Sequence, residues 1–308
     1  MRVLRYGFLP AAAVLAAVVP WAPAQAQGAS PVAGPPLGVT GTIRFHGDFP
    51  SRYVASRNVE VWLPPGYARD TTARYPVLYV QDGQNVFDPA TSYTHVDWGV
   101  DETMATLIAA GTIRPAIVVG IWNTPARFQE YMPQKALGPD SGFASGVPGM
   151  PGIHGPALSD AYLRFMVEEL KPFVDSAFRT LPGPANTFVM GSSMGGLISA
   201  YAVMEYPGVF GGAACLSTHW PAAGGAFADY LRHALPDPSS HRFYFDHGTA
   251  TLDSLYAPYQ RRVDAAMQAA GYALGRTWVT RVFPGADHSE RSWRTRVDVP
   301  LVFLLGKP

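Results

Sequence analysis

The chain has 308 residues, of which 48% are hydrophobic and 12% aromatic, enough to build one continuous core. Its 23 basic and 23 acidic residues cancel, so there is no net field to attract a nucleic-acid backbone or an anionic membrane. A small or neutral partner is expected instead. Because Cys215 is the single cysteine, an intramolecular disulfide is excluded, and its apolar surroundings indicate a buried structural thiol.

The first 26 residues have the features of an export signal. Arg2 and Arg5 form a basic start, residues 8–21 are apolar, and Ala24-Gln25-Ala26 matches a cleavage site. The apolar run is interrupted by prolines and is shorter than the ~20 residues of a spanning helix, so we predict no membrane anchor after cleavage. The predicted product is periplasmic or secreted. The predicted organisation is a signal over 1–26, a flexible lead-in over 27–38 and one folded domain over 39–308.

The pattern of apolar residues predicts a doubly wound, mainly parallel α/β sheet. Segments 41–46 and 57–63 alternate apolar and polar residues, which is typical of half-buried antiparallel strands at a sheet edge. Continuous apolar runs and helical spacing then alternate along the chain. We predict further strands at 77–80, 116–121, 187–190, 212–216, 243–245 and 278–283, and helices at 100–110, 161–178, 197–205, 256–270 and 299–305.

A long segment over 131–160 has many glycines and prolines and little periodicity. It exceeds the usual length of a connection, and loops of this size in compact domains are often functional. We predict a flap on the substrate side, with a surface insertion as the alternative.

The pentapeptide Gly191-Ser192-Ser193-Met194-Gly195 matches G-x-S-x-G and lies between a predicted strand and a predicted helix. A serine hydroxyl is a poor nucleophile until a base removes its proton, so it must project from a tight turn. Glycines at 191 and 195 leave room for that turn, and Gly196 lets the helix pack closely. The alternative is a plain Gly-Ser turn, but the strand-to-helix setting favours Ser193 as a nucleophile.

The expected base and acid follow Ser193 in the chain order serine, acid, histidine. His288 lies in a loop after the strand over 278–283, where it would hang over the carboxyl edge of the sheet. Two carboxylates could orient it: Asp253 in a loop and Asp246 at a strand end. The freer position of a loop residue favours Asp253, and Asp246 remains the alternative. We expect the other candidate histidines to be structural or surface residues: His219, His233, His241 and His247.

A tetrahedral intermediate also needs backbone donors for its oxyanion. The N–H of Met194, directly after the nucleophile, is the first candidate. The second is the N–H of Gln84 in the loop after the strand over 77–80, where Gly83 would allow unusual backbone angles. The sequence has no H-E-x-x-H and no nucleotide-binding loop, so neither a metal nor a cofactor is expected.

Several motifs in this order resemble an esterase family of α/β-hydrolases that includes enterochelin esterase-like enzymes, feruloyl and acetylxylan esterase domains and esterase D-type proteins. The resemblance covers about residues 39–305. It is carried by Val61-Trp-Leu-Pro-Pro-Gly-Tyr, Tyr75-Pro-Val-Leu-Tyr-Val-Gln-Asp-Gly-Gln-Asn-Val-Phe, Arg127 with Glu130-Tyr131, Glu169-Leu-Lys-Pro, Gly191-Ser-Ser-Met-Gly-Gly and His288-Ser-Glu with Trp293.

The resemblance implies cofactor-free hydrolysis of a carboxylic ester through an acyl-enzyme on Ser193, resolved by water that His288 activates. The implied substrates are small-molecule or carbohydrate esters: a siderophore ester, an acylated carbohydrate or a small aryl ester. An acyltransferase of the same fold and a catalytically silent binding protein are the alternatives, and the oligomeric state is left open.

Three further residues are candidates for binding the substrate. Arg127 is expected to pair with Glu130 beside the site, or to contact an anionic substrate. Trp98 and Trp122 could form an aromatic wall for a sugar or aryl group, although core packing is the commoner role of tryptophan.

Overall fold

The computed structural model describes residues 39–137 and 155–307. The predicted signal over 1–26, the lead-in over 27–38 and the central part of the predicted flap, 138–154, lie outside the described residues. Within the described ranges, no helix combines the length and apolar character needed to cross a membrane.

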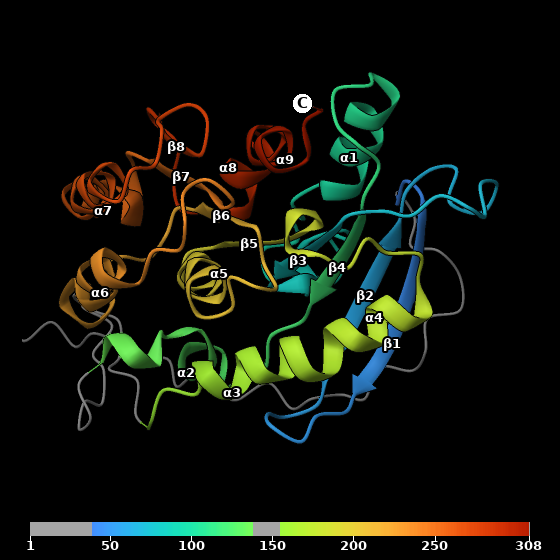
Figure 1. Cartoon of the computed structure of the whole chain (residues 1–308), viewed down its shortest axis with the longest axis horizontal. Helices are drawn as coiled ribbons and strands as arrows, with labels where there is room; N and C mark the ends of the chain where they lie inside the picture. Colours follow the sequence, from blue (N-terminus) through green and yellow to red (C-terminus); the bar gives the residue numbers. More distant parts are fainter. Residues whose placement is uncertain (1–38, 138–154, 308) are drawn as a thin grey trace, which may run out of the picture. The chain divides into compact units, whose positions relative to one another are not determined.

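The described residues form one eight-stranded sheet in the order β1-β2-β4-β3-β5-β6-β7-β8 (Figure 1). Strands β1 and β2 are antiparallel to their neighbours, and the other six run parallel. This confirms the predicted mainly parallel sheet. The strands are β1 (Thr42–Phe49), β2 (Arg57–Leu63), β3 (Val77–Gln81), β4 (Ile117–Ile121), β5 (Thr187–Ser192), β6 (Gly212–Leu216), β7 (Arg242–Gly248) and β8 (Trp278–Phe283).

The first two strands share an alternating sequence pattern but lie in different environments. Strand β1 is an exposed edge strand, as predicted. Strand β2 is not at the edge, because it pairs with β1 on one side and β4 on the other and is buried along most of its length. Its polar residue Glu60 is therefore only 7% exposed. Alternation in the sequence could not distinguish a half-exposed strand from one whose polar residue lies in the interior.

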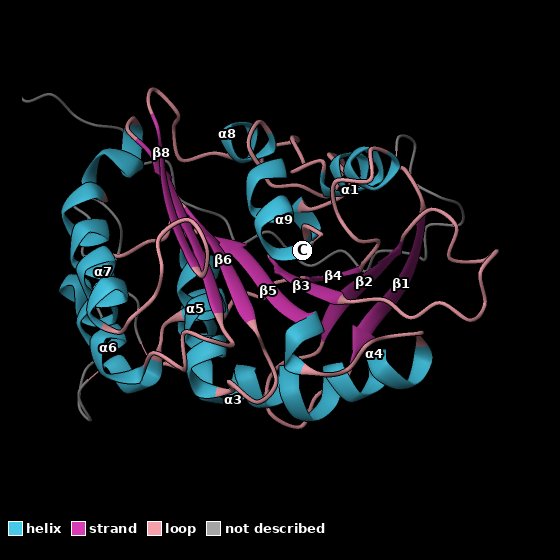
Figure 2. Ribbon diagram, turned by 45° about the horizontal axis from the view of Figure 1, so that its top comes forward, coloured by secondary structure: helices cyan, strands magenta, loops and turns pink. Residues whose placement is uncertain are grey.

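Helices cover both faces of the sheet (Figure 2). One core layer packs α1, α8 and α9 against the sheet, and the other packs α3 to α7. The helices are α1 (Val100–Ala109), α2 (Arg127–Tyr131), α3 (Ser159–Arg164), α4 (Lys171–Ala177), α5 (Met194–Glu205), α6 (Ala226–Ala234), α7 (Ala257–Ala269), α8 (Glu290–Arg294) and α9 (Asp298–Leu305). The short helices used below are η1 (Gly83–Asn85), η2 (Gln134–Ala136), the π-helical turn η3 (Phe165–Leu170) and η6 (Thr251–Leu255).

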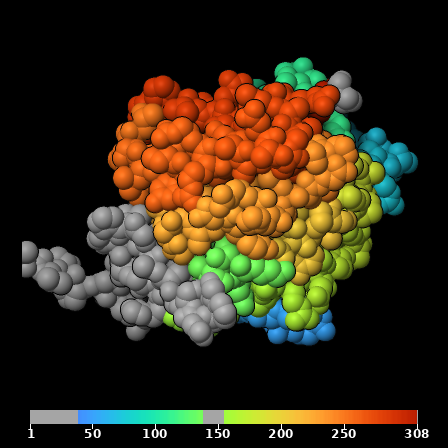
Figure 3. Space-filling model, turned by 60° about the vertical axis from the view of Figure 1, so that its left-hand side comes forward, coloured from blue at the N-terminus to red at the C-terminus, as the bar shows by residue number. Residues whose placement is uncertain are grey.

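The helical segment predicted at 161–178 is a continuous run of α3, η3 and α4, with a π-helical turn in its middle. Helix α6 was not predicted from the sequence. Figure 3 shows the residues of α6 and α7 (orange) on one face of the molecule, beside the residues of α2 (green). The described flanks of segment 131–160 belong to the body of the fold, since Tyr131 and Ser159 are fully buried.

Strand β6 carries the single cysteine. Cys215 is fully buried, and burial raises the pKa of its thiol well above the ordinary value. A protonated thiol in the core is a weak nucleophile, which confirms the structural role predicted for it.

Candidate active site

The predicted site residues follow the carboxyl ends of different strands. Ser193 comes after β5, Asp253 after β7 and His288 after β8, while Gln84 follows β3. Because these strands are parallel, their carboxyl ends meet at one edge of the sheet. Residues far apart in the sequence thus converge on one edge.

Ser193 occupies a sharp turn between β5 and α5. Its backbone angles, φ 56° and ψ −122°, are sparsely populated for a residue with a side chain. A Cβ at Gly191 would lie 2.5 Å from the Gly195 carbonyl oxygen, and one at Gly196 would lie 2.7 Å from Thr218 Oγ1. Larger residues could not pack here, which confirms the predicted requirement for glycine around the serine.

His288 and Asp253 are joined by a short hydrogen bond. Asp253 Oδ1 lies 2.6 Å from His288 Nδ1, and Asp253 Oδ2 accepts bonds of 2.6 Å from the Ser217 hydroxyl and the Gly248 N–H. Burial acts to raise the pKa of Asp253, but the three donors outweigh it and hold the pKa below its ordinary value. The carboxylate is therefore ionised at neutral pH, with both oxygens held in place.

Asp246, the alternative acid, has other partners. It is fully buried and accepts a hydrogen bond of 3.1 Å from the Arg296 guanidinium. Burial raises the pKa of Asp246, and the charge of Arg296 opposes that rise. Arg296 also donates to Ser217 Oγ at 2.8 Å, so the pair braces the hydroxyl that binds Asp253. The geometry brings Asp253 to His288, while Asp246 holds Arg296.

The loop after β3 packs directly against the turn at Ser193. A Cβ at Gly195 would lie 3.3 Å from Asp82 Oδ2. Gln84 lies in η1 and Met194 is the first residue of α5. The N–H groups in the first turn of a helix have no acceptor within that helix, so they are available to a ligand. The two predicted oxyanion donors therefore belong to segments that are in contact.

Gly83 has a different role from the predicted one. The positive φ in this loop, 57°, belongs to Asp82 rather than to Gly83. A Cβ at Gly83 would lie 2.5 Å from the Gly120 carbonyl carbon and 2.6 Å from the Ile121 nitrogen. Glycine is required because the loop lies directly on the end of β4, where a side chain would displace it.

Asp82 forms a salt bridge with Arg127. Arg127 Nε and Nη2 donate to the two carboxylate oxygens at 2.6 and 2.7 Å. The predicted pair between Arg127 and Glu130 is wrong, because Glu130 is buried and binds Arg57 through both of its oxygens at 2.7 and 3.0 Å. Asp82 and Glu130 are both buried carboxylates that need a cation, and each is paired with a different arginine. Arg127 thus binds the loop after β3 through two of its donors, and a contact with an anionic substrate stays a prediction.

The two candidate tryptophans differ in exposure. Trp98 is fully buried and packs on Trp293, with ring centroids 5.5 Å apart. It belongs to the core, so its predicted place in an aromatic wall is wrong. Trp122 is half-buried, and its Nε1 donates to Glu60 at 3.0 Å. Burial raises the pKa of Glu60 to about 7. A role for Trp122 in substrate binding stays a prediction.

Two further side chains lie beside Ser193: Tyr256, which the sequence did not single out, and His219, for which it predicted a structural or surface role. Tyr256 is fully buried, and its hydroxyl lies 2.9 Å from His219 Nδ1 and 3.4 Å from His288 Nδ1. Burial, with the charge of Asp253, raises the pKa of Tyr256 well above its ordinary value. No local signal distinguishes this tyrosine from a core aromatic residue, because its partners come from other loops.

Strained backbone is concentrated in these loops. Of the seven non-glycine residues with positive φ in the described ranges, four belong to the site: Asp82, Ser193, Ser217 and Thr251. Thr251 also accepts a hydrogen bond from the His288 N–H through its hydroxyl, at 3.0 Å. Such conformations cost about 1–3 kcal/mol each and persist where the surroundings enforce them, which is typical of functional sites.

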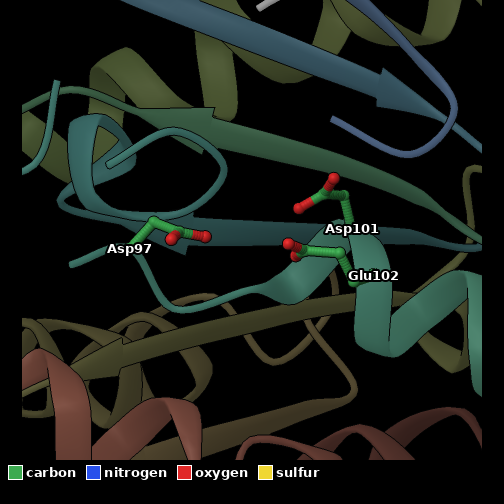
Figure 4. Close-up of side chains that lie close together, drawn as sticks. All are labelled: Asp97, Asp101 and Glu102. Carbon is green, nitrogen blue, oxygen red and sulfur yellow. The ribbon is translucent and has the colours of Figure 1, made fainter. Parts of the chain in front are cut away.

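One group of carboxylates in the described ranges has the spacing to hold a metal ion. Asp97, Asp101 and Glu102 place oxygens within 4.8 Å of one another, and Figure 4 shows the three side chains turned toward a common centre. Arg294, however, already donates to Asp97 at 2.6 Å and to Glu102 at 3.0 Å. The guanidinium supplies the positive charge that a cation would bring, so the group gives no support for a metal site.

Asp101→Asn is expected to gain stability relative to the wild type as the pH rises. Burial raises the pKa of Asp101 from 3.8 to about 7, so the folded chain keeps a proton that the unfolded chain loses. The wild type therefore loses unfolding free energy between about pH 4 and pH 7. Asparagine copies the protonated carboxyl and can still accept the Thr40 N–H. Measured by urea unfolding, the unfolding free energy of Asp101→Asn relative to the wild type should rise by about 1–2 kcal/mol by pH 8.

Asp70→Asn is the control for this measurement. Asp70 is exposed, and hydrogen bonds from Thr72 hold its pKa below the ordinary value. Its titration ends well below neutral pH, so the difference between this variant and the wild type should be constant from about pH 5 to pH 8. A constant difference for Asp101→Asn over the same range would contradict the prediction.

A family model described as Putative esterase matches residues 52–299. The chain is 26% identical over 203 residues to the endo-1,4-beta-xylanase/feruloyl esterase of Xylanibacter ruminicola, covering 61% of this chain and 22% of the relative. It is 26% identical over 175 residues to the uncharacterized protein YbbA of Bacillus subtilis, covering 56% of this chain and 62% of the relative. The matches thus span less than two-thirds of each relative.

Solved structures extend the comparison to the fold. An IroE-like serine hydrolase from Shewanella oneidensis superposes with a TM-score of 0.64 at 20% identity, over 85% of this chain and 79% of the other. A ferulic acid esterase gives 0.61 at 19% identity, over 86% and 98%. The enterobactin esterase of Shigella flexneri gives 0.64 at 18% identity, over 87% and 60%. These similarities confirm the α/β-hydrolase fold.

Proposed function

Because the chain belongs to the Putative esterase family of carboxylic-ester hydrolases, we propose that it cleaves esters through an acyl-enzyme on Ser193. The observation that carries this proposal is the hydrogen bond of 2.6 Å between His288 Nδ1 and Asp253, on the sheet edge where the strained turn presents Ser193. A nucleophile, an ionised acid and a base in this chain order are the components of a serine hydrolase.

The chemistry follows from these roles. Ser193 Oγ attacks the ester carbonyl carbon while its proton passes to His288 Nε2. Asp253 holds the proton on Nδ1 and stabilises the imidazolium. The oxyanion accepts hydrogen bonds from the N–H groups of Gln84 and Met194. Collapse of the intermediate breaks the bond to the alcohol, which leaves with the proton from His288. Water then attacks the acyl-enzyme by the same steps, releasing the carboxylic acid and regenerating the serine.

The proposed substrate is a small-molecule or carbohydrate ester. Support comes from structural neighbours described as a ferulic acid esterase and as an enterobactin esterase crystallised with enterobactin. Their different substrates are compatible with one catalytic arrangement, because specificity depends on the loops around it.

We also propose that residues 1–26 are a cleavable signal, which would place the enzyme in the periplasm or outside the cell. The basic start, the apolar run and the Ala24-Gln25-Ala26 site support this. N-terminal sequencing of the exported protein should begin at Gln27. An unprocessed N-terminus on protein retained inside the cell would contradict the proposal.

A fluorophosphonate probe tests the proposed nucleophile. The probe should modify one residue per chain, peptide mass spectrometry should place it on Ser193, and hydrolysis of p-nitrophenyl acetate should fall in proportion to labelling. Hydrolysis that continues in fully labelled enzyme would overturn the proposal, as would labelling at another residue. A catalytically silent protein would show neither labelling nor turnover.

A panel of ester substrates tests the substrate class. It should contain methyl ferulate, an acetylated xylo-oligosaccharide, a catecholate trilactone and short p-nitrophenyl esters. Free acid is the expected product even when an acceptor sugar is present. A new ester formed in preference to free acid would identify an acyltransferase.

A further inference from the structure

The hydroxyl of Tyr256, a residue that follows β7, lies where the segments after β5, β6 and β8 converge. It lies 2.9 Å from His219 Nδ1 and 3.4 Å from His288 Nδ1, and the neighbouring Ser193 side chain acts to lower its pKa. The tyrosine ring contacts both imidazoles edge-on, with centroids 5.9 Å from His219 and 5.8 Å from His288. One buried hydroxyl thus contacts the proposed base and a second histidine, and it lies beside the proposed nucleophile.

His219 connects the Tyr256 hydroxyl with the turn that carries Ser193. Its backbone N–H donates to the Ser193 carbonyl oxygen at 3.1 Å, while its ring meets the Tyr256 hydroxyl. The histidine is 3% exposed, so its position relative to the turn is fixed by packing as well as by the hydrogen bond. Ser193 is therefore held at its backbone by His219, and the ring of the same histidine holds the Tyr256 hydroxyl beside the serine.

A serine side chain has three staggered rotamers, and only one of them can direct Oγ toward a given base. Packing against a fixed neighbouring side chain favours one rotamer and removes the entropic cost of finding it during the reaction. Burial raises the pKa of Tyr256 well above its ordinary value, so its hydroxyl stays neutral and keeps its contacts with the two histidines throughout the working pH range.

We propose that Tyr256, supported by His219, is a positioning residue that holds the Ser193 hydroxyl and the His288 ring in their reactive arrangement. The inference rests on the proposed function, since it assigns the tyrosine to the same reaction. Tyr256 itself neither bonds to the substrate nor transfers a proton. Its loss should slow the attack by Ser193 and leave substrate binding unchanged.

Tyr256→Phe removes the hydroxyl and keeps the ring. We expect kcat for p-nitrophenyl acetate to fall about 10- to 100-fold, the range associated with a small misplacement of reacting groups, with KM changed less than about threefold. The rate of fluorophosphonate labelling should fall in parallel, because labelling requires attack by Ser193 and no turnover. Tyr272→Phe is the matched control: Tyr272 is also buried, and its hydroxyl donates to the Pro236 carbonyl at 2.9 Å, away from Ser193.

The outcomes separate the inference from the proposed function. A kcat for Tyr256→Phe equal to that of Tyr272→Phe, with wild-type enzyme labelled normally, would overturn only the inference. An increase in KM at unchanged kcat would also overturn it, since Tyr256 would then act in binding. Failure of the probe to label the wild type would overturn the proposed function.

His219→Leu gives a second measurement that does not depend on the folding of Tyr256→Phe. It removes the partner of the tyrosine hydroxyl, so kcat should fall at least about fivefold, by less than in Tyr256→Phe where both are measured. A kcat equal to that of the wild type would overturn the inference.

Discussion

Replacement of Ser193 by alanine is expected to lower kcat for short p-nitrophenyl esters by about 10⁵- to 10⁶-fold, to the level of catalysis that remains without a nucleophile. The loss is large because the remaining residues act as a unit: His288 has no proton to accept, and the oxyanion donors meet no covalent intermediate. Initial rates with purified enzyme measure the effect. Labelling by the fluorophosphonate probe should disappear in the same variant.

Ser192→Ala is the matched control. Ser192 is the neighbouring hydroxyl and is 2% exposed, but it ends β5 rather than forming the turn. Its replacement should leave kcat within a few-fold of the wild type. Turnover that persists in pure Ser193→Ala, or that disappears equally in both variants, would contradict the assignment of the nucleophile.

Asp253→Asn is expected to lower kcat by about 10³- to 10⁴-fold with little change in KM. Asp253 Oδ2 accepts the N–H of Gly248 and the hydroxyl of Ser217, so the carbonyl oxygen of asparagine would take that place. Its amide group would then face His288 Nδ1 and donate to it. The imidazole would carry its proton on Nε2, the nitrogen that must accept the proton of Ser193. Steady-state kinetics measure the loss.

Asp246→Asn should show the opposite pattern. Asp246 pairs with Arg296 in the interior, and breaking a buried pair costs about 3–5 kcal/mol because it leaves an uncompensated charge. Stability in urea should therefore fall strongly, while kcat of the folded fraction should stay within about tenfold of the wild type. If Asp246→Asn lost as much kcat as Asp253→Asn, the assignment of the acid would be wrong.

The local pattern of apolar residues was sufficient to predict most of the fold. Each predicted strand is present with nearly the predicted limits, because a buried strand must be apolar along its own length. Helix α6 was not predicted, because its nine-residue segment is short and directly follows Gly224 and Gly225. Its buried residues Phe227, Ala228 and Leu231 nevertheless recur at helical spacing. The edge position predicted for β2 was wrong because its neighbours are set by pairing with β1 and β4, which the segment itself does not encode.

The candidate site also combines features that the sequence predicted with features that it could not predict. The structure joins Asp253 and His288, the acid and base that the sequence favoured, by a hydrogen bond. Their catalytic roles remain a proposal. The partners of Arg127 and the burial of Trp98 were not predictable, because each depends on residues from distant segments. Proximity in the sequence suggested Glu130 as the ion-pair partner of Arg127, whereas in the structure the buried Glu130 binds Arg57.

The sequence by itself determined the sheet, the position of Ser193 in a strand-to-helix turn, and the loops that carry the acid and the histidine. These features depend on short-range requirements: apolar periodicity, and glycine where a Cβ would collide. The tertiary structure alone decided which carboxylate meets His288, and it alone brought Tyr256 and His219 to Ser193. Hydrogen bonds of about 3 Å depend on the relative positions of separate loops, and those positions follow from the packing of the whole sheet.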